Sequence, residues 1–231
     1  MRRYLFSALA GGLAACGGAG NISMPRPAGY RPASFDSAVA WARATVPPEN
    51  REIRFHWQFR DDQGAAGGRG RIRLALPDSA RLDVQGPLGS GRAAAFVSGD
   101  TALWAQPEQD VKRLVPNYPL FWALLGVVRV PDAAAAAHRY ADQSLTAWRY
   151  LVGSTDTVDY VRVAGSPSRL LAEVRQAGKK VGTVETIFGA DGLPATARLI
   201  VPSVPARLDV TFSSNQKAKP FASDTWTPPE P

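Results

Sequence analysis

The residues best suited to chemistry in this 231-residue chain are one cysteine, Cys16, and two histidines, His56 and His138. A single cysteine forms no intramolecular disulfide and no cysteine-based zinc site. Neither histidine belongs to a recognisable nucleophile motif, and the sequence has no phosphate-binding glycine motif and no cluster of metal ligands. We therefore expect a protein that is not an enzyme and that needs no cofactor or metal, in which the thiol of Cys16 is the one reactive group.

The residues before Cys16 predict an export signal. Arg2 and Arg3 precede a short apolar stretch and then Leu-Ala-Ala-Cys, which is the pattern of a secretory signal peptide over residues 1–15. The stretch is too short to span a membrane. Leu-Ala-Ala-Cys resembles the lipobox of bacterial lipoproteins, which implies cleavage before Cys16 and its acylation. No aspartate follows the cysteine, so the same resemblance favours the outer membrane. The alternative is an ordinary signal peptide beside an incidental cysteine.

Composition and charge describe a globular exported protein. Hydrophobic residues make up 45% and charged residues 20%, with a net charge of +7. There is no basic run interleaved with aromatic residues, so we expect no nucleic-acid partner. Residues 16–32 are rich in glycine and proline and predict a lipidated flexible tether that holds the body clear of the membrane. Residues 33–231 contain no further long linker and predict a single domain.

Alternating apolar and polar residues predict a mainly β fold. In residues 51–60, REIRFHWQFR, every second side chain is apolar, as in a strand with one buried face. The expected strands, about eleven in all, are 51–60, 71–76, 81–85, 91–98, 101–106, 145–152, 157–164, 169–177, 180–188, 195–201 and 206–213. Short strands at this spacing are typical of an antiparallel sandwich or barrel.

Two helices interrupt the strand pattern. Ser34 predicts the N-cap of a helix from Phe35 to about Thr45, which Pro47 and Pro48 end. Residues 119–130, PLFWALLGVVRV, are apolar on nearly every side, so a helix there must be buried or cover an apolar surface. We expect it to act as a lid across the mouth of a curved sheet.

The order of these features resembles the LolA/LolB superfamily of bacterial lipoprotein carriers and receptors. The most specific match is ARLDVQGPLGSGRAAAF, residues 80–96, which is similar to the strand, Pro-Leu-Gly turn and strand of LolB. The resemblance covers residues 33–228 and implies an incomplete, strongly curved antiparallel barrel with a helical lid. It also implies an apolar cavity that binds acyl chains of lipoproteins or lipids, for transport to or insertion into the outer membrane. The alanine run at 133–137 and the proline-rich C-terminus depart from the LolB pattern.

The resemblance and the alternation together give a set of candidate site residues. The turn Pro87, Leu88 and Gly89 implies a membrane-insertion loop, with Leu88 as the residue that enters the bilayer. A soluble periplasmic carrier protein is a further implied partner. The candidate residues for the acyl-binding cavity and its lid are Phe55, Trp57, Leu74, Leu82, Val84, Phe121, Trp122, Leu125, Trp148 and Tyr150.

Alternatives stay open for each of these assignments. Leu88 is equally consistent with an ordinary surface leucine, and the inward aromatic residues are equally consistent with a solid core. The alternative function is an envelope interaction or regulatory module in which the same fold binds a protein partner without lipid transfer.

Overall fold

The computed structural model describes residues 21–87, 91–109, 111 and 117–228. The signal peptide and Cys16 lie outside these ranges, as do Leu88 and Gly89. None of the helices in the described ranges has the length and apolarity needed to cross a bilayer.

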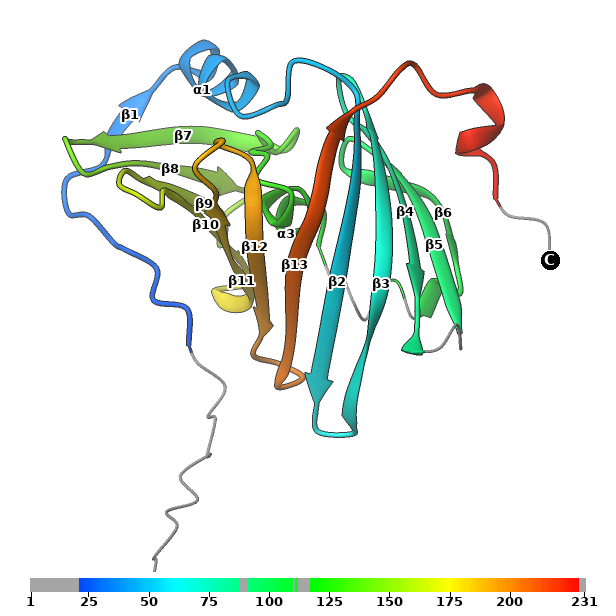
Figure 1. Cartoon of the computed structure of the whole chain (residues 1–231). Coiled ribbons are helices and arrows are strands. Elements are labelled where there is room, and N and C mark those ends of the chain that lie inside the picture. Colours follow the sequence, from blue (N-terminus) through cyan, green and yellow to red (C-terminus); the bar gives the residue numbers. More distant parts are fainter. Residues whose placement is uncertain (1–20, 88–90, 110, 112–116, 229–231) are drawn as a thin grey trace, which may run out of the picture.

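A single thirteen-stranded antiparallel sheet forms the body of the protein (Figure 1). In sheet order its strands are β1 (Arg31–Ala33), β7 (Ala134–Ala141), β8 (Leu145–Val152), β9 (Asp156–Val163), β10 (Arg169–Gln176), β11 (Lys179–Phe188), β12 (Pro194–Val201), β13 (Ala206–Lys217), β2 (Arg51–Asp61), β3 (Gly64–Ala75), β4 (Ser79–Gln85), β5 (Arg92–Ser98) and β6 (Thr101–Gln106). β13 pairs with β2 and so joins a C-wing, β7–β12, to an N-wing, β2–β6.

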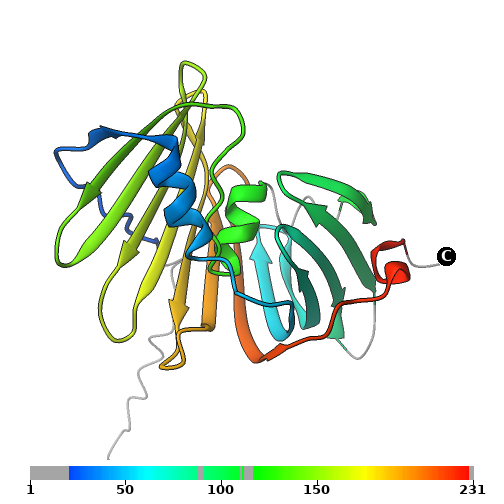
Figure 2. The same cartoon turned by 90° about the horizontal axis from the view of Figure 1, so that it is seen from above.

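The predicted fold class is confirmed: the protein is mainly β, and the described residues form one antiparallel sheet and the bounded α-helices α1 and α3 given below. All eleven expected strands are present, and β1 and β7 are additional. The sheet is open, since β1 and β6 are its free edges. It bends around a central helix without rolling up into a barrel, and the two wings flank that helix (Figure 2).

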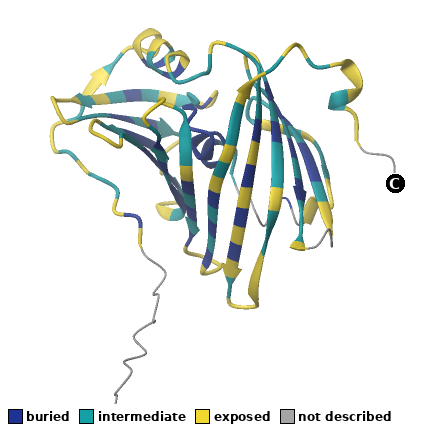
Figure 3. Ribbon diagram, in the orientation of Figure 1, coloured by how far each residue is buried: buried dark blue, intermediate teal, exposed yellow. Residues whose placement is uncertain are grey.

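Alternation along the strands places one apolar face toward the central helix. On β2, Ile53, Phe55, Trp57 and Phe59 are buried while Arg54 and the other intervening residues are largely exposed, a pattern visible as bands in Figure 3. The buried faces of both wings and the helix form one continuous core. The alternation along the strands therefore determines which face of the sheet is apolar.

The first helix, α1 (Phe35–Arg43), begins where the sequence predicts. The Ser34 hydroxyl accepts a hydrogen bond from the backbone N–H of Ser37, at 3.3 Å, as an N-cap residue does. Trp41 on this helix stacks on Trp148 of β8, with 5.8 Å between the ring centroids. α1 therefore covers the C-wing at the end of the sheet away from the β2–β3 turn (Figure 1).

The central helix is shorter than expected. α3 (Tyr118–Leu124) is followed by Gly126, whose φ of +77° ends the helical path. A Cβ at Gly126 would lie 2.8 Å from Phe188 Cε1, so the chain passes close to β11 here. The rest of the predicted helix, residues 125–130, is irregular. The prediction was wrong in length because apolar residues alone do not distinguish a helix from a buried loop.

The strand β7 was missed because its sequence is rich in alanine. Ala134–Ala141 pairs with β8 along its length, and Ala137 faces the core with 3% exposure. Alanine favours helices in isolation, but tertiary pairing overrides that weak preference. The small side chains also let α1 pack against this strand.

Part of the expected tether is bound to the sheet. Residues 21–30, which we call the strap, place Ile22 in a cluster with Ala147, Val161 and Leu171 on the convex face of the C-wing, and Met24 and Tyr30 pack beside it. Arg26 is 3.1 Å from Glu173 of β10. Glycine and proline predicted flexibility, but the apolar side chains between them cover a patch that water would otherwise contact.

The C-terminal segment covers part of the convex face of the N-wing. The 3-10 helix η2 (Ser223–Trp226) brings the Trp226 ring to 5.0 Å from Phe96 of β5. Trp104 of the edge strand β6 donates a hydrogen bond from Nε1 to the carbonyl oxygen of Trp226, at 2.8 Å. The aromatic contacts explain why this proline-rich end is ordered on the sheet.

Candidate functional site

A small apolar cavity lies between α3 and the N-wing. It has a volume of about 40 Å³ and no polar lining. Its walls come from β2, β3, β4, β13 and α3, and they consist of Phe55, Trp57, Ile72, Leu82, Val84, Phe121, Leu124, Leu125, Leu208, Val210 and Phe212. Ligand pockets for small molecules usually have about 300–1,000 Å³, so α3 as seated here nearly fills the space.

A larger open groove adjoins this cavity. It has a volume of about 570 Å³ and shares Trp57 and Val84 with the cavity. Its other walls belong to the β2–β3 turn, to Gly86 and Pro87 after β4, and to the start of β5. The groove therefore lies between solvent, beside Pro87, and the two residues that also line the cavity under α3.

Two aromatic residues of β2, Phe55 and Trp57, form part of the cavity wall. Phe55 lies over Gly70 of β3, since a Cβ at Gly70 would be 2.2 Å from Phe55 Cζ. Trp57 donates a hydrogen bond from Nε1 to the carbonyl oxygen of Arg69, at 3.3 Å. Glycine at position 70 therefore leaves room for an aromatic ring that a larger residue would displace.

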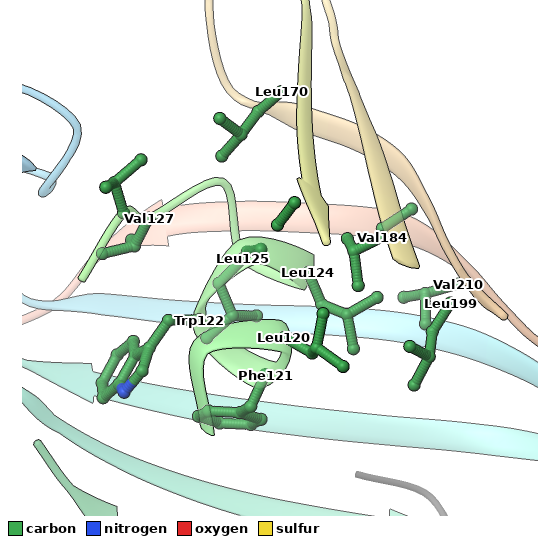
Figure 4. Close-up of a cluster of buried hydrophobic side chains, with 14 of the residues drawn as sticks. Leu120, Phe121, Trp122, Leu124, Leu125, Val127, Leu170, Val184, Leu199 and Val210 are labelled. Carbon is green, nitrogen blue, oxygen red and sulfur yellow. The ribbon is translucent and has the colours of Figure 1, made fainter. Parts of the chain in front are cut away.

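The helix α3 forms the inner wall of the cavity. Leu120 and Leu124 point toward Val184, Leu199 and Val210, and Phe121 points toward the strands of the N-wing (Figure 4). Leu120, Phe121, Trp122, Leu124 and Leu125 are each at most 6% exposed. Burial of such side chains contributes about 1.5–3 kcal/mol each, so roughly 10 kcal/mol holds the helix in place.

Local interactions add little to the stability of α3. Asn117 at its N-cap makes no capping hydrogen bond, and the helix has no acidic residue in its first turn and no basic residue in its last. A helix of 7 residues is also far shorter than the roughly 12–15 residues needed for helices that persist in isolation. The position of α3 therefore depends on its apolar contacts with the two wings.

Two hydrogen bonds fix the position of α3. Trp122 donates from Nε1 to the carbonyl oxygen of Gly99 in the β5–β6 turn, at 2.8 Å. Thr186 of β11 donates from Oγ1 to the carbonyl oxygen of Ala123, at 2.7 Å. These bonds connect the helix to both wings.

The structure brings six of the ten predicted cavity residues together. Phe55, Trp57, Leu82, Val84, Phe121 and Leu125 line the one cavity. Leu74 is buried in the core but does not line it, and Trp122 points instead toward Gly99. The lining residues that sequence reasoning missed come mainly from β13, namely Leu208, Val210 and Phe212. Their alternation was visible, but only the β13–β2 pairing places them beside Phe55.

Trp148 and Tyr150 lie elsewhere, under α1. Their rings stack with centroids 6.2 Å apart, and Tyr160 packs edge-on against Tyr150 at 6.1 Å. They do not line the cavity under α3, because their strand β8 lies beneath α1. Their role in acyl binding stays a prediction. Burial raises the pKa of the Tyr150 hydroxyl, so it stays protonated.

Within the described ranges, His, Cys, Asp and Glu side chains form no group of three suited to a metal ion. The predicted membrane loop is only partly described: Pro87 is exposed at the rim of the groove, while Leu88 and Gly89 lie outside the described residues.

No protein-family model and no curated protein matches this sequence. Several solved structures do resemble the fold. A DUF1329 family protein from Desulfovibrio piger has a TM-score of 0.50 at 8% identity, over 84% of this chain and 95% of that one. A LolA superfamily protein from Nitrosomonas europaea has a TM-score of 0.45 at 10% identity, over 84% of this chain and 97% of that one.

A third structure, described as an outer membrane lipoprotein-sorting protein domain from Vibrio parahaemolyticus, has a TM-score of 0.38 at 6% identity, over 82% of this chain and 94% of that one. At 8% identity, the similarity to the Desulfovibrio piger protein concerns the fold alone.

Proposed function

We propose that this protein is a lipid-anchored carrier that shelters an acyl chain of a lipoprotein or lipid between α3 and the N-wing. The observation that carries the proposal is a wholly apolar cavity beside an open groove, with Trp57 and Val84 lining both. An acyl chain enters along the groove and takes the place of α3 side chains. The binding is non-covalent and uses no cofactor.

The free energy gained by burying an acyl chain nearly balances the free energy lost when the α3 side chains leave the core. A sixteen-carbon chain gains about 0.8 kcal/mol per buried methylene, on the order of 10 kcal/mol in total. This is similar to the apolar burial that seats α3. A carrier must release its cargo, and the return of α3 to its closed position supplies the free energy for release.

The anchor in this proposal is Cys16. Five residues lie between Cys16 and the bound Ile22, and the six residue-to-residue steps span at most about 22 Å. The strap descends toward the end of the sheet that carries the β2–β3 and β4–β5 turns (Figure 1). Lipid on Cys16 would therefore hold the mouth of the groove, with Pro87 at its rim, close to the outer membrane on its periplasmic side.

The alternative function is an envelope interaction module without lipid transfer, and the small volume of the closed cavity favours it. Titration with a fluorescent fatty acid distinguishes the two functions. The mature chain carrying Cys16→Ser should bind the probe saturably at one site, and native mass spectrometry should detect lipid that copurifies with it. A delipidated chain that binds no fatty acid would contradict the carrier proposal.

A further inference from the structure

The convex side of the sheet carries an unusual density of arginines where β2, β3, β12 and β13 lie side by side. Strand pairing places seven arginines of these strands on this side. Arg73 is paired with Asp83 of β4, at 2.8 Å, and we call the other six the arginine face: Arg54, Arg60, Arg69, Arg71, Arg198 and Arg207. The Arg54 side chain is 66% exposed and that of Arg71 is 43% exposed. In Figure 1 the outer side of β13, β2 and β3 is open except at its upper end, where the described segment after β13 passes toward η2.

Several of these arginines stand directly opposite one another. Arg54 pairs with Arg71 across β2 and β3, and Arg60 pairs with Arg207 across β2 and β13. Like charges in directly opposed positions destabilise a sheet. Glu52 offsets the first pair, at 3.2 Å from Arg54 and 3.8 Å from Arg71. One carboxylate is therefore shared between two guanidinium groups.

The same sharing recurs at Asp209 of β13, which is 2.7 Å from Arg198 and 2.6 Å from Arg207. Burial alone would raise the pKa of this carboxyl, but the hydrogen bonds from Arg207 and Arg198 hold it below its ordinary value. The carboxylate thus stays ionised and keeps both guanidinium groups in position. Each arrangement of two arginines and one acid retains a positive charge and unused N–H donors.

We propose that the arginine face binds an acidic surface of a partner protein. Guanidinium groups bind carboxylates through two parallel hydrogen bonds. Successive outward residues of a strand are about 6.8 Å apart, and neighbouring strands are about 4.8 Å apart. The arginine face therefore presents a two-dimensional array of donors. Its charge complements a cluster of aspartate and glutamate residues.

The position of the arginine face favours a protein partner over a membrane. This argument rests on the proposed function. If the mouth of the groove faces the bilayer, the strands stand upright on it and the arginine face points sideways. The strap covers the convex face beyond it on the C-wing, and η2 covers it on β5 and β6. The arginine face is the uncovered strip between them, open to a protein beside the anchored domain.

A direct test measures binding of poly-L-glutamate to the mature chain carrying Cys16→Ser. The test variant combines Arg54→Gln, Arg69→Gln and Arg71→Gln. The matched control combines Arg31→Gln, Arg43→Gln and Arg139→Gln, which remove the same charge from exposed arginines outside the face. We expect the test variant to bind about tenfold more weakly and the control to bind within about twofold of the unmodified chain.

Equal losses in the two variants would show a general effect of net charge and would overturn the proposal. So would binding of anionic phosphatidylglycerol vesicles, but not of poly-L-glutamate, that depends on the same three arginines. Circular dichroism confirms that both variants fold. Fatty-acid titration of the same samples separates the two proposals. Failure to bind fatty acid would contradict the carrier function and leave the arginine-face proposal standing. Failure to bind poly-L-glutamate would contradict the arginine-face proposal and leave the carrier function standing.

Discussion

Leu120 of α3 occupies the space that a side chain at Gly182 of β11 would need, since a Cβ at Gly182 would lie 2.7 Å from Leu120 Cδ1. The carbonyl oxygen of Ile200 would lie 3.2 Å from the same Cβ, so the position is closed on two sides. The central helix therefore sits in a depression of the C-wing that depends on a glycine. A substitution at Gly182 can therefore displace α3 without changing any residue that lines the cavity.

Gly182→Ala should loosen α3. The added methyl group overlaps Leu120, and such overpacking destabilises cores by about 1–3 kcal/mol. We expect a lower unfolding midpoint in chemical denaturation and, because the closed position of the helix is weakened, tighter binding of a fluorescent fatty acid. Leu120→Ala in the same chain removes the overlap, so the double variant should lose less stability than the sum of the single variants. Additive losses would contradict direct contact between these positions.

Ala93→Trp should block acyl binding. Ala93 is a wall residue of the groove beside Val84, and an indole there fills the passage to the cavity. We expect fatty-acid affinity to fall about tenfold or more with little change in stability, because the site is partly open to solvent. Ala135→Trp, on the exposed side of β7, is the matched control and should bind as the unmodified chain does. Equal affinity in the two variants would exclude this entry route.

Leu88→Glu should impair delivery of the acyl chain to membranes without impairing its binding. A charged side chain at the predicted membrane loop opposes entry into the apolar part of the bilayer. We expect slower transfer of a fluorescent fatty acid from the protein to liposomes and an unchanged affinity for it in solution. Unchanged transfer would identify Leu88 as an ordinary surface residue.

Acid should weaken the attachment of the strap. Burial alone would raise the pKa of Glu173, but hydrogen bonds from Lys180 and Arg175 outweigh it and lower the pKa below its ordinary value. A lowered pKa stabilises the folded state above the ordinary pKa of glutamate, and this stabilisation is lost as pH falls through the folded-state value. We expect proteolysis within residues 21–30 to speed up on acidification.

The control for this prediction is Glu173→Gln. The variant lacks the titrating carboxylate that binds Arg26, so its strap should be cleaved readily even at neutral pH, with a weaker dependence on acid. An acid response equal to that of the unmodified chain would show that another group controls the strap.

Strand periodicity made the fold largely predictable. The alternation in residues 51–60 identifies the buried face of β2, including Phe55 and Trp57, without knowledge of its neighbours. Sequence order does not reveal that β13 closes back onto β2, because that pairing joins residues about 150 positions apart. The residues that β13 adds to the cavity were therefore missed.

Residues with weak or misleading local signals account for the other differences. The alanines of β7 and the glycine- and proline-rich strap gain their structure from tertiary contacts, as Ala137 in the core and Ile22 on the C-wing show. Trp148 has the same strand pattern as Trp57, yet it packs under Trp41 of α1. The finer resemblance to LolB stays a prediction.

Photo-cross-linking with a diazirine-labelled fatty acid tests the central claim most directly, because it reports which residues contact the bound chain. We predict saturable labelling of Trp57, Val84, Phe121 and Leu125, which line the cavity under α3; the first two also line the groove. Excess palmitate should prevent this labelling. Labelling confined to exposed apolar residues such as Leu103 and Val204, or labelling that palmitate does not compete away, would contradict the account.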